Sequence, residues 1–406
     1  MTEKEARVRS DVLLSKLGSK AAYVSSRYAM YEQDYLPRPF PTIVPEKFQQ
    51  LIHVLGWATK SVNMLSDRVV FEQFGNDIIN ANQIWDYNDG DVLSDSLVLS
   101  ALISSCSFIY ISADADGYPR LQAIDGSRAT GVIDPQTHML SEGVAVLERD
   151  SLSLPTKTAY FTPEETFVFD NEGNVSRYDN PTGFPLLVPV CHRPSEVKPF
   201  GRSRITPASI GYIHDAALVL MRTHCAGEFY AFPQKYALGL SSEVEFDEAQ
   251  ATMAAFLKVT QDENGEKPTF GQFQQASMTP YIDELRSKAA LFAGENDMTI
   301  DDLGFSTDNP ATRESIEAAH ESLRMSARKA QRSFGSGFKN AAFLAACLRD
   351  GRKYGRQIMA DITCEWRPIF EPSPSSLSGI GDAVTKIQQA FPDYFTEDKL
   401  HRMTGM

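Results

Sequence analysis

Apolar residues in the first 105 positions recur at helical spacing in three stretches. The pattern is helical from residue 8 and becomes irregular towards the proline cluster at 37–41, which indicates an entry helix followed by an anchoring arm. Over 48–71 apolar residues recur every three or four positions, as on one face of a helix. A further helix is predicted over 91–105, after the turn sequence Asn-Asp-Gly. We expect these helices to pack on a sheet.

The stretch 106–190 alternates short apolar runs with turn sequences. The runs SFIYIS (107–112), FVFD (167–170) and LLVPV (186–190) are separated by DADG, DPQTH and DNEGN. Short apolar segments bounded by Asp, Asn, Gly and Pro are typical of antiparallel hairpins.

Proline-containing start signals mark the helices of the second half. Thr-Pro at 206–207 and 279–280 and Asn-Pro at 309–310 each place a capping residue before a proline that suits the first helical turn. The last of these helices reaches about residue 350, which is about 60 Å if unbroken. Gly335 and Gly337 interrupt it and each costs about 1 kcal/mol relative to alanine, so we expect a bend there.

Between the two Thr-Pro helices lies a segment that reads as a compact αβ module. It combines strand-like sequence at 233–240, a helix at 245–259 and the segment PTFGQF at 268–273. After the long helix come a strand-like segment at 361–369, a linker rich in proline and serine at 371–379, and a helix at 380–391.

The charge balance changes this picture in one respect. The chain has 53 acidic against 39 basic residues, a net charge of −14, so most of its surface should repel nucleic acid. A tight DNA binder would be basic, although an acidic balance is also common in ordinary soluble proteins. The sequence has no apolar stretch of membrane-spanning length and no signal-peptide core, and its five cysteines are scattered, so we expect a protein of the reducing cytoplasm.

Candidate chemistry is sparse. The nucleotide-binding motif GxxxxGK[ST], the nucleophile motif GxSxG and the zinc motif HExxH are all absent. Asp114, Asp116 and Asp125 suggest a calcium loop, but Gly117 comes too early and Tyr118 occupies a ligand position.

Two further groups of residues offer a metal site or a nucleophile, but packing roles explain them better. His224, with Cys225 beside it and Glu228 four positions on, lacks further zinc ligands, so a packed helix face is favoured. Cys191 and His192 are neighbours that would point to opposite sides of a strand. We therefore predict a non-enzyme, without catalytic residues, cofactor or metal.

The order of these segments resembles the portal proteins of siphophages over nearly the whole chain. The resemblance is carried by a tryptophan-asparagine turn, by a strand that leads through Arg-Pro to a G-x-S turn, by the first Thr-Pro helix and its continuation, and by the long helix. The matching residues are Trp85, Asn88, Pro189, Arg193, Pro194, Gly201, Ser203, Asp215, Ala216, Glu228, Ala231, Pro233, Glu314, Ser315 and Glu317, followed by the segment CEWRPIFEPS.

The resemblance implies an α+β portal fold with an α/β wing, a helical stem, a small αβ clip, a long kinked helix and a small helical crown. The wing would begin with residues 1–200 and be completed, with the crown, by 351–406. Between these parts the resemblance gives stem helix 1 (201–230), the clip (231–278), stem helix 2 (279–295), the tunnel loop (296–310) and the long kinked helix (311–350).

The resemblance also implies a function. Twelve copies would form a ring at one capsid vertex, as a channel for double-stranded DNA in packaging and ejection. The ring would be a docking site for the terminase large subunit and the head–tail connector, beside major capsid and scaffolding proteins, with no membrane partner. Such a protein is assembled in the host bacterial cytoplasm and ends in the virion.

The tunnel loop is the predicted DNA-facing site. Met298 and Thr299 stand near where the family usually carries a proline, and the aspartates bring negative charge to the constriction. Because each phosphate neutralised by a cation adds affinity that translocation must break, an acidic wall would let DNA slide. The predicted site residues are Asn296, Asp297, Met298, Thr299, Asp301 and Asp302.

Other interpretations stay open at this point. The tunnel-loop segment can equally be a solvated acidic loop with no DNA near it. A capsid or scaffolding component would suit an acidic chain without a site, but should show a coiled-coil pattern or a simple shell fold. An uncharacterised hydrolase would need ionisable residues that converge in space despite the missing motifs.

Overall fold

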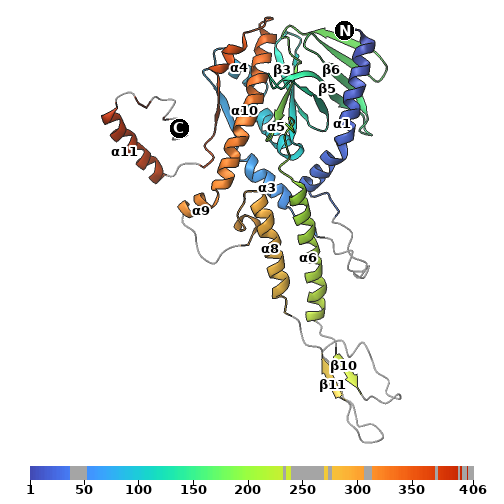
Figure 1. Cartoon of the computed structure of the whole chain (residues 1–406), viewed down its shortest axis with the longest axis vertical. Helices are drawn as coiled ribbons and strands as arrows, with labels where there is room; N and C mark the ends of the chain where they lie inside the picture. The colour runs from blue at the N-terminus through green and yellow to red at the C-terminus, as the bar shows by residue number, and fades with distance from the viewer. Residues whose placement is uncertain are drawn as a thin grey trace.

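The computed structural model describes residues 1–36, 53–231, 235–238, 269–272, 277–305, 313–370, 374–391, 394–395 and 400. Its largest part is a body of helices and sheets, from which the helices α6 (Pro207–Ala231) and α8 (Thr279–Glu295) extend side by side (Figure 1). The hairpin β10–β11 (Lys235–Leu238 and Thr269–Gln272) lies at the far end of these helices. The predicted α+β class is confirmed.

The first helix, α1 (Glu3–Glu32), starts at a capping box. The side chain of Thr2 accepts the N–H of Glu5 at 3.3 Å, and the Glu5 carboxylate accepts the N–H of Thr2 at 3.0 Å. Ala6 and Leu13 of this helix join Tyr160 of the underlying sheet in one buried cluster. The predicted arm at 37–41 lies outside the described residues.

The hairpins predicted for 106–190 are confirmed as two antiparallel sheets. The smaller sheet has the order β3-β2-β9, with β2 over Cys106–Ala113, β3 over Pro119–Asp125 and β9 over Leu187–Cys191. The larger sheet follows chain order through β4 (Ala129–Ile133), β5 (Leu140–Arg149), β6 (Pro155–Phe161), β7 (Glu165–Asp170) and β8 (Val175–Asp179).

The helix predicted over 48–71 is wrong at its C-terminal end. The helix α3 spans only Trp57–Ser66, and Phe71 begins the strand β1 (Phe71–Gly75); residues 48–52 are outside the described part. The periodicity failed here because Phe71 is held by a distant strand, pairing with Trp366 of β12 (Thr363–Trp366). The pattern at one position cannot show that a partner strand lies almost 300 residues away.

The helix predicted over 91–105 is confirmed as α5 (Gly90–Ser104), which follows the short helix α4 (Ala81–Tyr87). It packs on β2 and β3, while α1 covers β4, β5 and β6. The expectation that the helices lie on sheet faces therefore holds for α1 and α5, whereas α3 packs mainly on other helices, α5, α1 and α6.

The first Thr-Pro start signal works as predicted, and the second does not. Thr206 Oγ1 accepts the N–H of Ser209 at 3.1 Å and so caps α6. In α8, however, Thr279 is already inside the helix, Met278 is the cap residue, and Pro280 occupies the first turn. Instead of capping, the Thr279 N–H donates to Ser277 Oγ at 3.2 Å. The helix predicted at 245–259 lies outside the described residues.

The long kinked helix is present, but its break is not at the glycines. Instead the helix is interrupted at His320, between α9 (Arg313–Ala319) and α10 (Glu321–Arg349). Residues 309–310, its predicted start, are outside the described part. The interruption predicted at Gly335 and Gly337 is therefore wrong, because α10 continues through both residues.

These two glycines instead let α10 lie close to its neighbours. A Cβ on Gly337 would be 3.0 Å from the carbonyl oxygen of Pro189, and one on Gly335 would be 3.3 Å from Cys364. The two glycines within a helix therefore have a structural cause, which is the close approach of β9 and β12 to α10.

The C-terminal part corrects one boundary. The 3-10 turn η2 (Arg356–Ala360) and β12 follow α10, and β12 confirms the strand predicted at 361–369. The last helix, α11 (Pro374–Ala390), begins six residues earlier than predicted, because Pro374 suits a first turn and part of the supposed linker is helical. No helix in the described ranges is long and apolar enough to cross a membrane.

Candidate functional site

The loop that follows α8 starts with a fixed turn. Asp297 adopts a left-handed backbone conformation (φ +53°), and the N–H of Met298 donates to the carbonyl of Ala293 at 2.9 Å. This is the six-to-one hydrogen bond of a Schellman ending, which reverses the chain direction at the end of a helix. The turn aims the Asp297 side chain back into the body.

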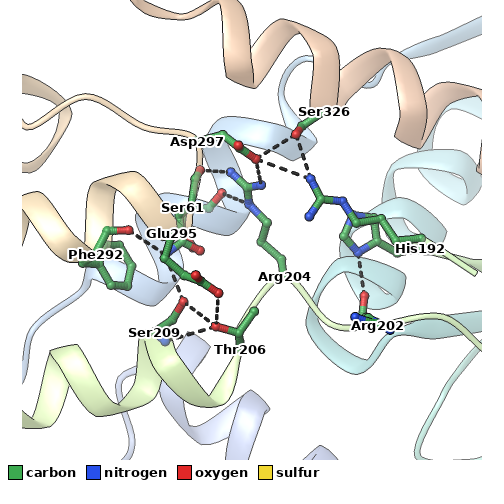
Figure 2. A network of polar contacts seen from close by, with 12 residues as sticks. Ser61, His192, Arg202, Arg204, Thr206, Ser209, Phe292, Glu295, Asp297 and Ser326 are labelled. Atoms are coloured by element: carbon green, nitrogen blue, oxygen red, sulfur yellow. Dashed lines mark hydrogen bonds and ion pairs between the residues drawn. The ribbon is translucent and has the colours of Figure 1, made fainter. Parts of the chain in front are cut away.

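Asp297 meets a buried arginine there. Arg204, on the segment just before α6, places Nη1 3.1 Å from Asp297 Oδ2, and its side chain is only 3% exposed (Figure 2). The same guanidinium donates to the backbone carbonyl of Asn296, and its Nε lies 3.4 Å from the carbonyl of Ser61. Burial lowers the pKa of Arg204, and the neighbouring Asp297 carboxylate opposes that shift.

A second arginine extends the network to the long helix. Arg193 Nη2 donates to Ser326 Oγ of α10 at 2.8 Å and lies 3.4 Å from Asp297 Oδ2. Ser326 in turn donates to Asp297 Oδ2 at 2.7 Å. One carboxylate oxygen therefore joins the loop to α10 and to both arginine-bearing segments.

The helices α6 and α8, predicted as the stem, are tied together at the same level. Thr206 donates to Glu295 Oε1 at 2.8 Å, and the buried Asn296 donates from Nδ2 to Ser209 Oγ at 2.9 Å (Figure 2). The start of α6 and the end of α8 are thus joined through the cap of one and the last turn of the other. We call Arg193, Arg204, Asn296, Asp297 and Ser326 the stem junction.

The second half of the loop has its own anchor. Asp302, in the 3-10 turn η1 (Asp301–Leu303), accepts the N–H and the hydroxyl of Thr299, both at 2.8 Å. His320 places Nε2 3.1 Å from Asp302 Oδ2, and its Nδ1 lies 2.8 Å from the carbonyl of Ile316. Burial would raise the pKa of Asp302, but the bonds from Thr299 and His320 outweigh it, and the pKa is lowered.

The structure therefore brings the predicted loop residues together but gives them different positions. Asn296 and Met298 are buried, while Asp297 and Asp302 point into polar contacts inside the chain. Asp301 is exposed and makes no ion pair within the described residues. Residues 306–310 of the predicted tunnel loop lie outside the described part.

Sequence reasoning missed the partners of the loop. Arg204 and His320 carry the two anchors, and Ser326 links the first of them to α10. The one available signal was local: Arg204 stands immediately before the start of a helix that carries few charges. Nothing in the sequence indicates that its partner is Asp297.

The residues considered as metal ligands or nucleophiles make packing contacts and hydrogen bonds inside the chain. His224 stacks on His53 with ring centroids 4.4 Å apart, and Cys225 lies 3.6 Å from Met221 Sδ. His192 is buried, its Nδ1 lies 2.7 Å from the carbonyl of Arg202, and burial lowers its pKa to about 3. Among the described residues no three His, Cys, Asp or Glu side chains converge as a metal site.

Comparison with known proteins places this chain in a family. The family model described as "Phage portal protein, SPP1 Gp6-like" matches residues 52–391, which is most of the chain. The chain belongs to this portal family. Two relatives are the portal protein of Mycobacterium phage L5, 25% identical over 409 residues, and that of Mycobacterium phage D29, 25% identical over 404 residues. The matches cover 95% and 94% of this chain and 82% of each relative.

Solved structures with a similar chain come from a gene transfer agent. One is the neck of the native GTA particle (TM-score 0.46, 11% identity, 86% of this chain and 89% of that chain). Another is the virion of the native particle (TM-score 0.47, 12% identity, 94% of this chain and 99% of that chain).

Family membership confirms the resemblance predicted from the order of segments. The chain has the role of a portal protein and is a structural component of the bacteriophage virion. Portal proteins form oligomeric rings in phage particles. The stem junction is the place where α6, α8, the loop and α10 are held together.

Proposed function

We propose that twelve copies of this chain form a ring at one capsid vertex, whose central channel carries double-stranded DNA during packaging and ejection. The ring would dock the terminase large subunit during packaging and the head–tail connector afterwards. Major capsid and scaffolding proteins would surround it as it assembles in the host cytoplasm. Its role would be structural, with no catalytic step.

The observation that carries the proposal is the anchoring of the loop. Asp297 fixes one end to Arg204, and Asp302 fixes the other to His320 at the break between α9 and α10. A loop held at two points keeps its position when a moving polymer passes it. It is also attached to α10, because Ser326 of that helix bonds to Asp297 and His320, at the start of the helix, bonds to Asp302.

The charges of the loop favour weak contact with DNA. Asp297 and Asp302 are engaged by Arg204 and His320, so Asp301 is the carboxylate of η1 that faces solvent. Twelve such carboxylates in a ring would repel phosphates from the channel wall. The wall would then form no cation–phosphate contact that DNA must break at each step of translocation. DNA would then be confined by shape, with no readout of bases.

Electron microscopy of the purified chain, combined with native mass spectrometry, tests the proposal. We expect rings of twelve copies with an axial opening wide enough for a B-form duplex. Monomers of compact shape would favour the hydrolase alternative, and closed shells without an opening would favour a capsid or scaffolding role. Either result would overturn the proposal.

A further inference from the structure

The body carries a cationic groove that the portal role does not yet use. It lies between α10, η2 and β12, has a volume of about 970 Å³, and is lined by Arg328, Arg332 and Lys339 of α10 together with Arg356 of η2. Met325 and Trp366 contribute apolar surface to the same groove. In a chain of net charge −14, a concentration of cations of this kind needs an explanation.

The α10 cations of the groove are open to a partner. Within the part of the chain that the structure describes, Arg328, Arg332 and Lys339 make no ion pair within 4.0 Å. Arg356 is held by a neutral partner, donating from Nη2 to Asn340 Oδ1 at 3.0 Å. Cations held this near to one another repel, so an anionic partner that enters the groove gains attraction from several of them at once.

A surface of opposite charge lies at the start of α5. Asp86, Asp89, Asp91 and Asp95 are all exposed and make no ion pair within 4.0 Å among the described residues. Between two of them stands Val92, whose side chain is 72% exposed. We call these five residues the acidic ridge.

The ridge and the groove match in spacing as well as in charge. Asp91 and Asp95 are one helical turn apart on α5, and Arg328 and Arg332 are one turn apart on α10, which is about 6 Å of helix rise in each case. The exposed Val92 offers an apolar side chain to the apolar part of the groove. The ridge therefore supplies both kinds of contact that the groove presents.

Within one chain the ridge and the groove are separated by a layer of aromatic rings. Trp85 of α4 packs on Phe338 of α10 with ring centroids 5.2 Å apart, and Phe338 packs on Trp366 at 5.8 Å. Trp366 lines the groove, whereas Trp85 lies on the helix that leads into the ridge. The ridge and the groove of one chain therefore do not bind each other, and each is left for another copy.

We infer that the acidic ridge of one subunit binds the cationic groove of the next. The contact joins two different surfaces, which makes it heterologous, and a heterologous contact generates a ring when its rotation closes. This inference rests on the proposed ring and names the surfaces that join its subunits. A DNA strand is the other anion to weigh, but bare phosphates would not use the apolar part of the groove.

Charge reversal tests the contact. A groove variant (Arg332→Glu with Lys339→Glu) and a ridge variant (Asp91→Lys with Asp95→Lys) should each associate at least about 100-fold more weakly than the unaltered chain, because like charges then face each other. Mixing the two variants should restore association, since each intact surface then finds its intact counterpart. A chain that carries all four substitutions should also associate, because the charges are exchanged.

The control for net charge is Lys4→Glu with Lys20→Glu, two exposed positions of α1. It makes the same charge change as the groove variant and should leave association as it is. Thermal midpoints within a few degrees of the unaltered chain show that each variant is folded. Sedimentation equilibrium measures association whether the assemblies are closed or open, so a missing ring counts against the proposed function and not against this contact.

Three results would overturn the inference. In the first, a folded groove variant associates as strongly as the unaltered chain. In the second, the groove variant assembles normally but binds a fluorescent DNA duplex more weakly, which would assign the groove to phosphates. Failure of the mixture and of the four-substitution chain to associate would equally exclude a pairing of these two surfaces.

Discussion

Arg204 and Asp297 lie 93 residues apart in the chain and meet at 3.1 Å, Nη1 to Oδ2, where α6 begins and α8 ends. The two side chains are unequally buried, with 3% of Arg204 exposed and 26% of Asp297. The arginine also donates to the backbone at Asn296 and Ser61. The contacts with the backbone therefore hold the Arg204 side chain in place, and the Asp297 carboxylate of the loop binds to it.

This asymmetry predicts unequal effects of removing either partner. Asp297→Asn leaves a charged arginine in a buried position, and we expect it to lower the free energy of unfolding by about 3 kcal/mol or more. Arg204→Met leaves a carboxylate that still has Arg193 and some water, so a smaller loss of about 2 kcal/mol is expected. Chemical unfolding followed by circular dichroism measures both, and a larger loss for Arg204→Met would contradict the picture of the arginine as the more buried charge.

Asp301 gives the sharpest test of the loop as a channel wall. Asp301→Lys should slow DNA packaging in vitro without lowering the stability of the ring, because its side chain is exposed and makes no ion pair among the described residues. In the proposed ring, the lysine of each subunit would add an attraction to phosphate that translocation must break. Asp301→Asn is the matched control, which removes the negative charge without adding a cation.

The salt dependence of packaging separates this mechanism from a general loss of function. Raised salt should bring the Asp301→Lys ring back towards the unaltered rate, since exposed attractions are screened. Packaging rates unchanged by lysine at low salt would leave the loop as a solvated turn with no DNA beside it.

Local signals in the sequence predicted much of the fold. Thr206 caps α6 as its position before Pro207 indicated, and the turn sequences of 106–190 separate strands as expected. These features depend on residues within a few positions of one another. The errors came where a distant segment decides the outcome, as at Phe71, whose pairing with Trp366 overrides a helical pattern.

The candidate site was predictable only as a stretch of chain. The loop residues lie in one short segment, so the stretch from Asn296 to Asp302 could be named from the family resemblance, which places a tunnel loop between these two helices. The direction of each side chain could not, because it depends on the left-handed turn at Asp297 and on partners in α10 and before α6. Two of the three aspartates expected to face DNA are therefore engaged inside the chain.

Burial of His192 predicts a pH-dependent stability. Burial lowers its pKa to about 3 from an ordinary value of 6.5, while the bond with the Arg202 carbonyl opposes the shift. Between pH 6.5 and about 3, His192 is therefore protonated in the unfolded chain but neutral in the folded chain. The free energy of unfolding should fall as pH drops below about 6.5, by up to about 1.4 kcal/mol per pH unit from this group. The contribution is fully present above pH 6.5.

A phenylalanine at this position isolates that effect. His192→Phe keeps a ring beside Phe334, whose centroid lies 6.1 Å away, but loses the bond to Arg202, so we expect about 1 kcal/mol less stability at pH 7.5. As pH falls, only the unaltered chain is destabilised by this group, so its advantage of about 1 kcal/mol should disappear near pH 6 and His192→Phe should be the more stable protein at pH 4. Unfolding midpoints that stay a constant distance apart over this range would show that His192 takes up its proton while folded.

Gly337 tests whether close packing, and not flexibility, explains the glycines of α10. In an exposed helix, alanine in place of glycine is stabilising by about 1 kcal/mol. At Gly337 a Cβ would lie 3.0 Å from the carbonyl oxygen of Pro189 and 3.0 Å from Val190 Cγ2, and the first of these is backbone that cannot turn aside. We therefore expect Gly337→Ala to lower the free energy of unfolding by about 1–3 kcal/mol, as overpacking does elsewhere.

Gly211→Ala in α6 is the control, because no atom lies within 4 Å of its Cβ, and it should be stabilising or neutral. If Gly337→Ala raised the denaturant midpoint as well, the contact between α10 and β9 would be looser than the structure shows, and the glycine would serve movement of the helix.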